Sequence, residues 1–288
     1  MDRQFLAQEI NMKKLFILLL LVSHGLFAQQ VDMLCWNIES GGAQVEAITE
    51  RLSKDFTSVD ILALSEVSLK DFPEIKSAFA KAINAKVGAH ITEIGFDDRL
   101  AVFYNKERFK MEDYQEIEGL SLQNPGLRPA QVLKLKDLES GKMFYVVNNH
   151  LSRGRAGEEW KRYAQAYMLQ NWARSLEDEI IFLVGDFNFD YETRDPEASR
   201  SEAFDILRLD RYGNVHLHWV KPDKIIPTQC TWDERRNTCR YHSVLDFVFC
   251  NEKALSLNPK SWIIEKDGEF PDGDVRPDHR PVLCTFNW

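Results

Sequence analysis

Residues 181–190 read IFLVGDFNFD, and this stretch decides the fold. The apolar run that begins at residue 180 is typical of a buried β-strand, and it changes abruptly to Gly185, Asp186 and Asn188. We expect this strand to end at residue 186. A carboxylate and an amide directly after a buried strand stand on a rigid support, where catalytic groups are commonly placed.

Short apolar runs alternate with helical patterns along the rest of the chain. Further strands are expected at residues 31–38, 60–65, 100–105, 131–136, 143–151, 243–250, 261–265 and 280–288, and helices at residues 44–54, 72–84 and 157–176. The sequence contains no repeat and no low-complexity linker. Residues 29–288 are therefore expected to form one mixed α/β domain, in which strands pack in layers with helices outside.

The first 28 residues have the pattern of a secretory signal. Lys13 and Lys14 precede an apolar run at residues 15–22, and Ala28 is a small residue after which we expect cleavage. The apolar run is too short to span a bilayer comfortably, although an uncleaved membrane anchor is the alternative. The mature protein is expected to be periplasmic or secreted, with no transmembrane anchor and no stable protein partner.

Five cysteines follow this segment. Cys230 and Cys239 flank a short polar loop whose ends can meet, and in an exported protein they are expected to form a disulfide. Cys35, Cys250 and Cys284 lie inside apolar runs and are expected to be small buried side chains.

The net charge of -9 argues against a surface coated with positive potential for gripping duplex nucleic acid. A local basic region remains at residues 151–162. Arg153 and Arg155 in this region are candidates for phosphate contacts, because the guanidinium group matches phosphate with paired donors. The alternative is a solvated turn in which Glu158 and Glu159 offset the positive charge.

Polar side chains stand where most of the apolar runs stop or are interrupted. They are Asn37, Glu66, Asn148, His150, Asp186, Asn188, Asp246, Asp278 and His279. Each one alone has a structural explanation, because Asn and Asp commonly end strands by bonding to nearby backbone. Together they offer the oxygen ligands that Mg²⁺, Mn²⁺ and Ca²⁺ prefer, with histidines as donors near neutral pH. The set indicates metal-assisted attack of water on phosphorus.

Six motifs occur in the order seen in the endonuclease/exonuclease/phosphatase superfamily, which this chain resembles. They are WNIE (36–39), SE (65–66), NNHLSR (148–153), GDFN (185–188), LDFVF (245–249) and PDHRPV (277–282). The resemblance runs over essentially the whole mature chain. It implies a four-layer α/β sandwich of two packed, mostly antiparallel sheets with flanking helices, and an active site at the edge where strand-end loops converge.

The resemblance also implies which residues hold metal and substrate. Asn37 and Glu66 look like the metal-site pair, with Glu66 binding the cation directly, and Asp278 supports the metal or the neighbouring histidine. The implied cofactor is Mg²⁺, with Mn²⁺ or Ca²⁺ as alternatives. Asn148 joins the two arginines named above as a candidate for substrate binding.

The catalytic roles follow from the same resemblance. Asp186 looks like the residue that orients or deprotonates the attacking water, and Asn188 like the one that contacts the phosphate or its metal. His279, with its ring fixed by Asp246, would polarise a phosphoryl oxygen. His150 would donate a hydrogen bond to the scissile phosphate.

The motifs reduce the number of candidate substrate classes but do not select one. The 5-phosphatase branch loses support because Leu183 and Val184 precede Gly185 and because Asp246 lies in SVLDFVF, and the AP-endonuclease branch favours SDH where this chain has PDH. We expect an exported nuclease or phosphodiesterase whose partner is a phosphate ester, nucleic acid among the candidates. The alternative is a lipid or small-molecule phosphoesterase. A noncatalytic binding protein would require a broken site, and none of the expected positions is missing.

Overall fold

The computed structural model describes residues 29–39, 42–154, 156–194, 200–230, 232–233, 235–239, 242–267 and 275–288. The expected signal segment, residues 1–28, and Arg155 lie outside the described residues. Within these ranges, no helix is long and apolar enough to cross a membrane.

Two six-stranded sheets form the centre of the molecule. The first contains, in spatial order, β13 (Lys260–Ile263), β14 (Val282–Asn287), β1 (Gln30–Asn37), β2 (Ile61–Val67), β4 (Arg99–Asn105) and β3 (Val87–Ile91). The second contains β5 (Phe109–Ile117), β6 (Ala130–Asp137), β7 (Met143–His150), β8 (Ile181–Glu192), β12 (Ser243–Cys250) and β9 (His218–Trp219). Only the β1–β2 and β7–β8 pairs are parallel in these two sheets of the described chain. Both sheets are therefore mostly antiparallel, as the sequence predicts.

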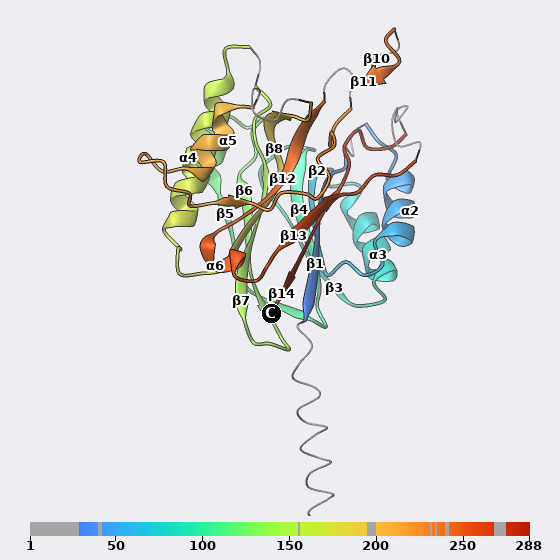
Figure 1. Ribbon diagram of the computed structural model, residues 1–288. Coiled ribbons are helices and arrows are strands. Elements are labelled where there is room, and N and C mark those ends of the chain that lie inside the picture. The colour runs from blue at the N-terminus through green and yellow to red at the C-terminus, as the bar shows by residue number, and fades with distance from the viewer. Residues whose placement is uncertain are drawn as a thin grey trace, which may run out of the picture.

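Helices cover the outer faces of the sheets. They are α2 (Val45–Asp55), α3 (Phe72–Ala82), α4 (Glu159–Arg174), α5 (Glu202–Arg208), the short α6 (Glu252–Leu255) and the 3₁₀ turn η1 (Glu118–Ser121). Figure 1 shows α2 and α3 on one side of the molecule and α4 and α5 on the other, with the strands between them. The four-layer α/β sandwich that the sequence predicts is confirmed.

The strand β1 shows why the layers form. Met33 and Cys35 belong to the core cluster that includes both sheets, whereas Leu34 and Trp36 belong to the cluster that includes α2 and α3. Successive side chains of a strand point to opposite faces, so a strand that is apolar at every position must be covered on both sides. The apolar runs of the sequence therefore require helices on the outer face of this sheet as well as a second sheet.

The strand β8 is longer than the sequence predicts. It continues from Ile181 to Glu192, so our expectation that it ends at residue 186 is wrong. The backbone bends at Gly185, where φ is 119°, and continues with φ of 52° at Asn188 and 51° at Asp190. The polar residues after Gly185 interrupt the apolar pattern by which a strand is recognised in the sequence. The sequence therefore predicts too early an end, although the pairing with β12 continues.

Two other strands carry irregularities beside polar residues. The pairing of β2 with β4 shifts between Leu64 and Val67, and Glu66 in this bulge has a φ of 60°. The pairing of β12 with β8 shifts between Val244 and Asp246. Bulges re-aim side chains, and here they turn polar groups out of otherwise apolar strands.

The expected disulfide between Cys230 and Cys239 is present. The segment that it closes carries the short pair β10 (Trp232–Asp233) and β11 (Thr238–Cys239). The other three cysteines are free and buried, as expected.

Candidate active site

A polar cleft of about 310 Å³ lies where ends of strands from both sheets meet. Its lining residues are Glu39, Glu66, Arg128, His150, Arg153, Asp186, Asn188, Leu245, Asp278 and His279. Most of these residues were identified from the sequence, and they come from positions as far apart as Glu39 and His279. We call this cavity the catalytic cleft.

Asn37 connects the carboxylates of the two sheets. Its amide Nδ2 donates to Oε1 of Glu66 at 2.9 Å and to Oδ2 of Asp186 at 3.2 Å, and its Oδ1 accepts from the backbone N–H of Glu39 at 3.1 Å. Asn37 and Asp186 are almost fully buried, whereas the Glu66 side chain is 27% exposed. Asn37 thus lies beneath the cleft, between two carboxylates that would otherwise repel one another.

His279 and Asp246 form a buried pair. Nδ1 of His279 lies 2.7 Å from Oδ2 of Asp246, and the Trp36 indole N–H donates to the His279 carbonyl oxygen at 2.9 Å. Burial acts to lower the pKa of His279, but the charge and hydrogen bond of Asp246 raise it to about 10. Asp246 therefore favours the protonated form of the ring, and it occupies Nδ1.

Asp186 and His150 are buried groups whose pKa values shift in opposite directions. Burial, followed by the charge of Asp246, raises the pKa of Asp186 to about 8. Burial and then the positive charge of Arg128 hold the pKa of His150 well below its usual range. Nε2 of His150 lies 3.5 Å from Oδ2 of Asp186. A neutral imidazole thus faces a carboxyl group that binds a proton readily when no cation is present.

The donor atoms of the cleft fit a hard divalent cation. Among the described residues, Glu66, Asp98 and His150 have ligand atoms that all lie within 4.8 Å of one another; Asp186, Asp246 and His279 lie equally close, but Nδ1 of His279 is bound there to Asp246. Within the described chain, Oδ1 of Asp246 is buried without a hydrogen-bond partner. Buried carboxylates are stable when they are paired or bind metal, and oxygen-rich sets favour Mg²⁺, Mn²⁺ or Ca²⁺.

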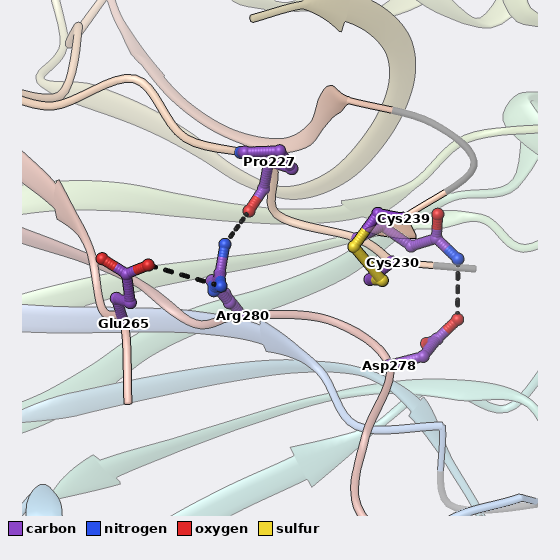
Figure 2. Close-up of a disulfide and its surroundings, with 7 residues drawn as sticks. Pro227, Cys230, Cys239, Glu265, Asp278 and Arg280 are labelled. Atoms are coloured by element: carbon purple, nitrogen blue, oxygen red, sulfur yellow. Dashed lines mark hydrogen bonds and ion pairs between the residues drawn. A yellow bond between two sulfur atoms is a disulfide. The ribbon is translucent and has the colours of Figure 1, made fainter. Parts of the chain in front are cut away.

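Asp278 is held in the cleft from the side of the disulfide. Its Oδ2 accepts from Nε2 of Gln229 at 2.9 Å, and its carbonyl oxygen accepts from the Cys230 N–H at 3.1 Å. Figure 2 shows the disulfide beside Asp278. It also shows Arg280, whose guanidinium donates to the Pro227 carbonyl at 2.8 Å and lies 3.6 Å from Glu265. The segment 227–230 thus ties the chain around His279 in place.

The remaining predicted residues differ in their placement. Asn188 lines the cleft, and its Nδ2 donates to the Leu151 carbonyl at 3.0 Å. Arg153 lines the cleft with an exposed side chain. Asn148 is fully buried, does not line the cleft and donates to the Leu64 carbonyl of the other sheet at 2.8 Å. Arg155, as noted above, is not among the described residues.

Arg128 and Asp98 belong to the site, although the sequence patterns did not single them out. Arg128 lines the cleft and forms an ion pair with Asp98, whose carbonyl oxygen also accepts from Arg128 Nε at 3.0 Å. Both residues stand just before strands, β4 and β6. Because these strands run antiparallel to β2 and β7, their starts lie at the same edge as the ends of β2 and β7. A search of strand starts as well as strand ends would have found them.

Comparisons with known proteins agree with this architecture. A model of the Endonuclease/Exonuclease/phosphatase family matches residues 34–268. The comparison with curated protein sequences gave no match.

Several solved structures share the fold. An endonuclease/exonuclease/phosphatase from Bacteroides vulgatus is 17% identical with a TM-score of 0.66, and the match covers 89% of this chain and 98% of that one. D. rerio TDP2, solved with a single-strand DNA product, is 18% identical with a TM-score of 0.66 over 90% and 100% of the two chains. A mannosyl-6-phosphatase from Bacteroides thetaiotaomicron is 17% identical with a TM-score of 0.61 over 88% and 98%. At these identities the likeness shows the fold alone.

Proposed function

The chain belongs to the Endonuclease/Exonuclease/phosphatase family, a family of phosphate-ester hydrolases, and we propose that it is an exported enzyme that uses a divalent cation. The observation that carries this proposal is the convergence of Glu66, Asp186 and the His279–Asp246 pair on one cleft. Phosphoryl transfer depends largely on positioning and on charge stabilisation, which these groups are suited to supply.

Glu66 is the principal candidate for holding the cation, with Asn37 and Asp278 as supporting groups. A bound Mg²⁺ or Mn²⁺ would neutralise charge that develops on the phosphoryl oxygens. Asn37 now directs its amide nitrogen toward the carboxylates, and a 180° rotation of the amide would present Oδ1 instead. The side chain of Glu66 is 27% exposed and that of Asp186 is 3% exposed. Of these two carboxylates, an entering ion therefore meets Glu66 first.

Asp186 is positioned to orient the attacking water and accept its proton. Its two oxygens are fixed by the Asn188 N–H at 2.9 Å and by the Asn37 amide at 3.2 Å, so the carboxylate cannot rotate away. A general base must lie within hydrogen-bond reach of the water it deprotonates, and a fixed carboxylate meets this condition best.

The two histidines are suited to donate to the phosphate. Because Asp246 holds Nδ1 of His279, Nε2 is the nitrogen left for the cleft, and the protonated ring can stabilise a phosphoryl oxygen. His150 is neutral and provides a second donor without an added charge. Asn188 and Arg153 complete the contacts that we propose for the phosphate.

The substrate is either a nucleic-acid phosphodiester or a smaller phosphate ester. D. rerio TDP2 with its single-strand DNA product and the B. thetaiotaomicron mannosyl-6-phosphatase share the fold, so both classes are candidates. Export is supported by the signal-like pattern of residues 1–28 and by the Cys230–Cys239 disulfide, because disulfides persist mainly in oxidising compartments.

Two substitutions test the proposal. We expect Asp186→Asn and His279→Ala each to abolish Mg²⁺-dependent hydrolysis of p-nitrophenyl phosphate and bis-p-nitrophenyl phosphate, with circular dichroism unchanged. His216→Ala is the matched control, because His216 also lies near an aspartate, Asp210 at 3.4 Å, but outside the catalytic cleft. Full activity in both cleft variants would overturn the assignment.

A further inference from the structure

A second cavity of about 430 Å³ opens beside the catalytic cleft. We call it the side cleft. Its walls include Arg153, Arg162, Asp190, Gln229, Ser243 and Leu245. Arg153 and Leu245 also line the catalytic cleft, so the two cavities adjoin. Its volume lies within the range of roughly 300–1,000 Å³ that is usual for small-molecule sites.

The side cleft has a rigid wall. The Arg162 side chain is 5% exposed, and its guanidinium donates to the Arg153 carbonyl at 2.7 Å and to the Ser201 hydroxyl at 3.2 Å. It also lies 3.5 Å from Asp190, whose side chain is 60% exposed. Arg162 therefore fixes the backbone of Arg153 and the carboxylate of Asp190 without itself facing solvent.

Asp190 presents its carboxylate from a backbone position that few residues occupy. Its φ is 51°, and a non-glycine residue with positive φ is uncommon. Such conformations cluster at functional sites. Asp190 and Arg153 place opposite charges around this cavity. Gln229 and Ser243 add an amide and a hydroxyl group.

The described part of the lining is mostly polar and charged. The charged groups among its described residues are the carboxylates of Glu159, Asp190 and Glu192 and the guanidiniums of Arg153 and Arg162, and Glu192 is also paired with Arg194 at 2.9 Å. An acyl chain would find little apolar surface here.

We propose that the side cleft binds the hydroxyl groups of a sugar or another polyol whose single phosphate lies in the catalytic cleft. The proposal rests on the proposed phosphoesterase function and names its substrate class. A hydroxyl group both donates and accepts hydrogen bonds, so a ring with several hydroxyls satisfies carboxylate and guanidinium groups at once. Asp190 would be the main acceptor, and Arg153 would contact both the phosphate and the ring.

The test compares phosphate esters with and without a hydroxylated ring. With the mature protein and Mg²⁺, kcat/KM is measured for a panel of hexose 6-phosphates, for cyclohexylmethyl phosphate, for p-nitrophenyl phosphate and for a single-stranded oligothymidylate. Cyclohexylmethyl phosphate has a six-membered ring and the same phosphorylated hydroxymethyl group, but it lacks the hydroxyls and the ring oxygen. We expect the best hexose phosphate to exceed it by about tenfold or more, since hydrogen bonds to charged groups are strong.

The variant Asp190→Asn is the second arm. Asparagine tolerates the left-handed backbone but lacks the charge, so the ratio of kcat/KM for the hexose phosphate to that for cyclohexylmethyl phosphate should fall by about tenfold. The matched control is Asp178→Asn, which removes a largely exposed charge that lies 3.6 Å from Lys253 and outside both clefts. This control should leave the ratio unchanged.

The outcomes separate two kinds of failure. If no phosphate ester is hydrolysed, p-nitrophenyl phosphate included, the proposed function is wrong and this proposal fails with it. If p-nitrophenyl phosphate is hydrolysed but no hexose phosphate is preferred over cyclohexylmethyl phosphate, this proposal alone is overturned. A higher kcat/KM for oligothymidylate, or an unchanged ratio in Asp190→Asn, would also overturn it alone.

Discussion

Asp186 is a buried carboxyl group whose proton competes with any cation in the cleft. Burial and the neighbouring charge of Asp246 raise its pKa to about 8, so the metal-free cleft favours the protonated form of this group. A cation favours the ionised form, and its binding must therefore release the proton. When no metal is bound, each further carboxylate in the cleft raises the free-energy cost of ionising its neighbours.

This competition predicts a pH dependence of metal binding. Below pH 8, each unit of rising pH should strengthen the apparent affinity for Mn²⁺ by up to about tenfold, since one proton leaves per ion bound, and the slope should flatten above pH 8. Calorimetric titrations at pH 6, 7, 8 and 9 measure it. Asp186→Asn should bind more weakly with a shallower slope. An affinity that does not change from pH 6 to pH 8 would contradict this role of Asp186.

Gly185 is the residue that allows β8 to continue past the cleft. Its φ is 119°, and a Cβ atom there would collide with the carbonyl oxygen of Asn149 on β7. We expect Gly185→Ala to lower the free energy of unfolding by about 1–3 kcal/mol more than Gly141→Ala does. Gly141 also has positive φ, at 72°, but no atom lies within 4 Å of the added Cβ. Denaturant unfolding of both variants measures the difference, and equal losses would show that the collision is relieved.

The sequence identified most of the cleft at the level of single residues. Polar residues after apolar runs located Asn37, Glu66, Asp186 and His279, because a strand end in a two-sheet sandwich leads to a shared edge. The same pattern also included Asn148, which the structure buries between the sheets. Whether an amide at a strand end points into the cleft or into the core depends on the pairing of strands, and periodicity does not reveal pairing.

Among the elements, the strands with continuous apolar runs were predicted closely, and β12 has the predicted bounds of residues 243–250. The edge strand β5 was not predicted, because it is mostly polar and exposed and the adjacent Glu112 and Asp113 interrupt any apolar alternation. The strand β3 was missed for a related reason, since it is short and contains Gly88 and His90. Such strands are stabilised by their pairing with β6 and β4, a tertiary effect.

The disulfide-closed segment is an element that connects stability to the site. The double variant Cys230→Ser/Cys239→Ser should lower the free energy of unfolding by about 2–3 kcal/mol, because the open loop regains freedom in the unfolded chain. It should also lower kcat/KM for p-nitrophenyl phosphate, because the Cys230 N–H and Gln229 both hold Asp278. Thermal unfolding and steady-state kinetics measure the two effects.

Reduction provides the control for this variant. Dithiothreitol should reproduce both losses in the wild-type protein and have no effect on the double variant, because the three remaining cysteines are free and buried. Unchanged kinetics in the double variant would show that the segment holds Asp278 without the disulfide.

At the scale of the whole molecule, the cleft exists because two sheets are held together at one edge. Asn148 on β7 crosses between them, and its Nδ2 donates to the carbonyl oxygens of Leu64 at 2.8 Å and Ala101 at 3.3 Å on the other sheet. These carbonyls lie beside the bulge that turns Glu66 toward the cleft. A buried amide thus links the two sheets next to the bulge that carries Glu66.

This arrangement predicts that Asn148 contributes to stability and does not bind substrate. Asn148→Ala should lower the free energy of unfolding by about 1–3 kcal/mol, because two buried carbonyls lose their donor. It should leave the KM for p-nitrophenyl phosphate unchanged. Arg153→Gln should do the reverse, raising KM with little loss of stability, since its side chain is exposed. If Asn148→Ala raised the KM without loss of stability, Asn148 would be assigned to substrate binding instead.

The most direct test of the whole account is the metal dependence of turnover. The purified protein is stripped with a chelator, dialysed and assayed for hydrolysis of p-nitrophenyl phosphate as single metals are returned. We expect no turnover in the stripped protein, recovery with Mg²⁺ or Mn²⁺, and little recovery in Glu66→Gln at the same metal concentration, because oxygen ligands dominate the cleft. Full turnover in the stripped protein, or recovery with Zn²⁺ alone, would contradict a hard-cation site built on Glu66.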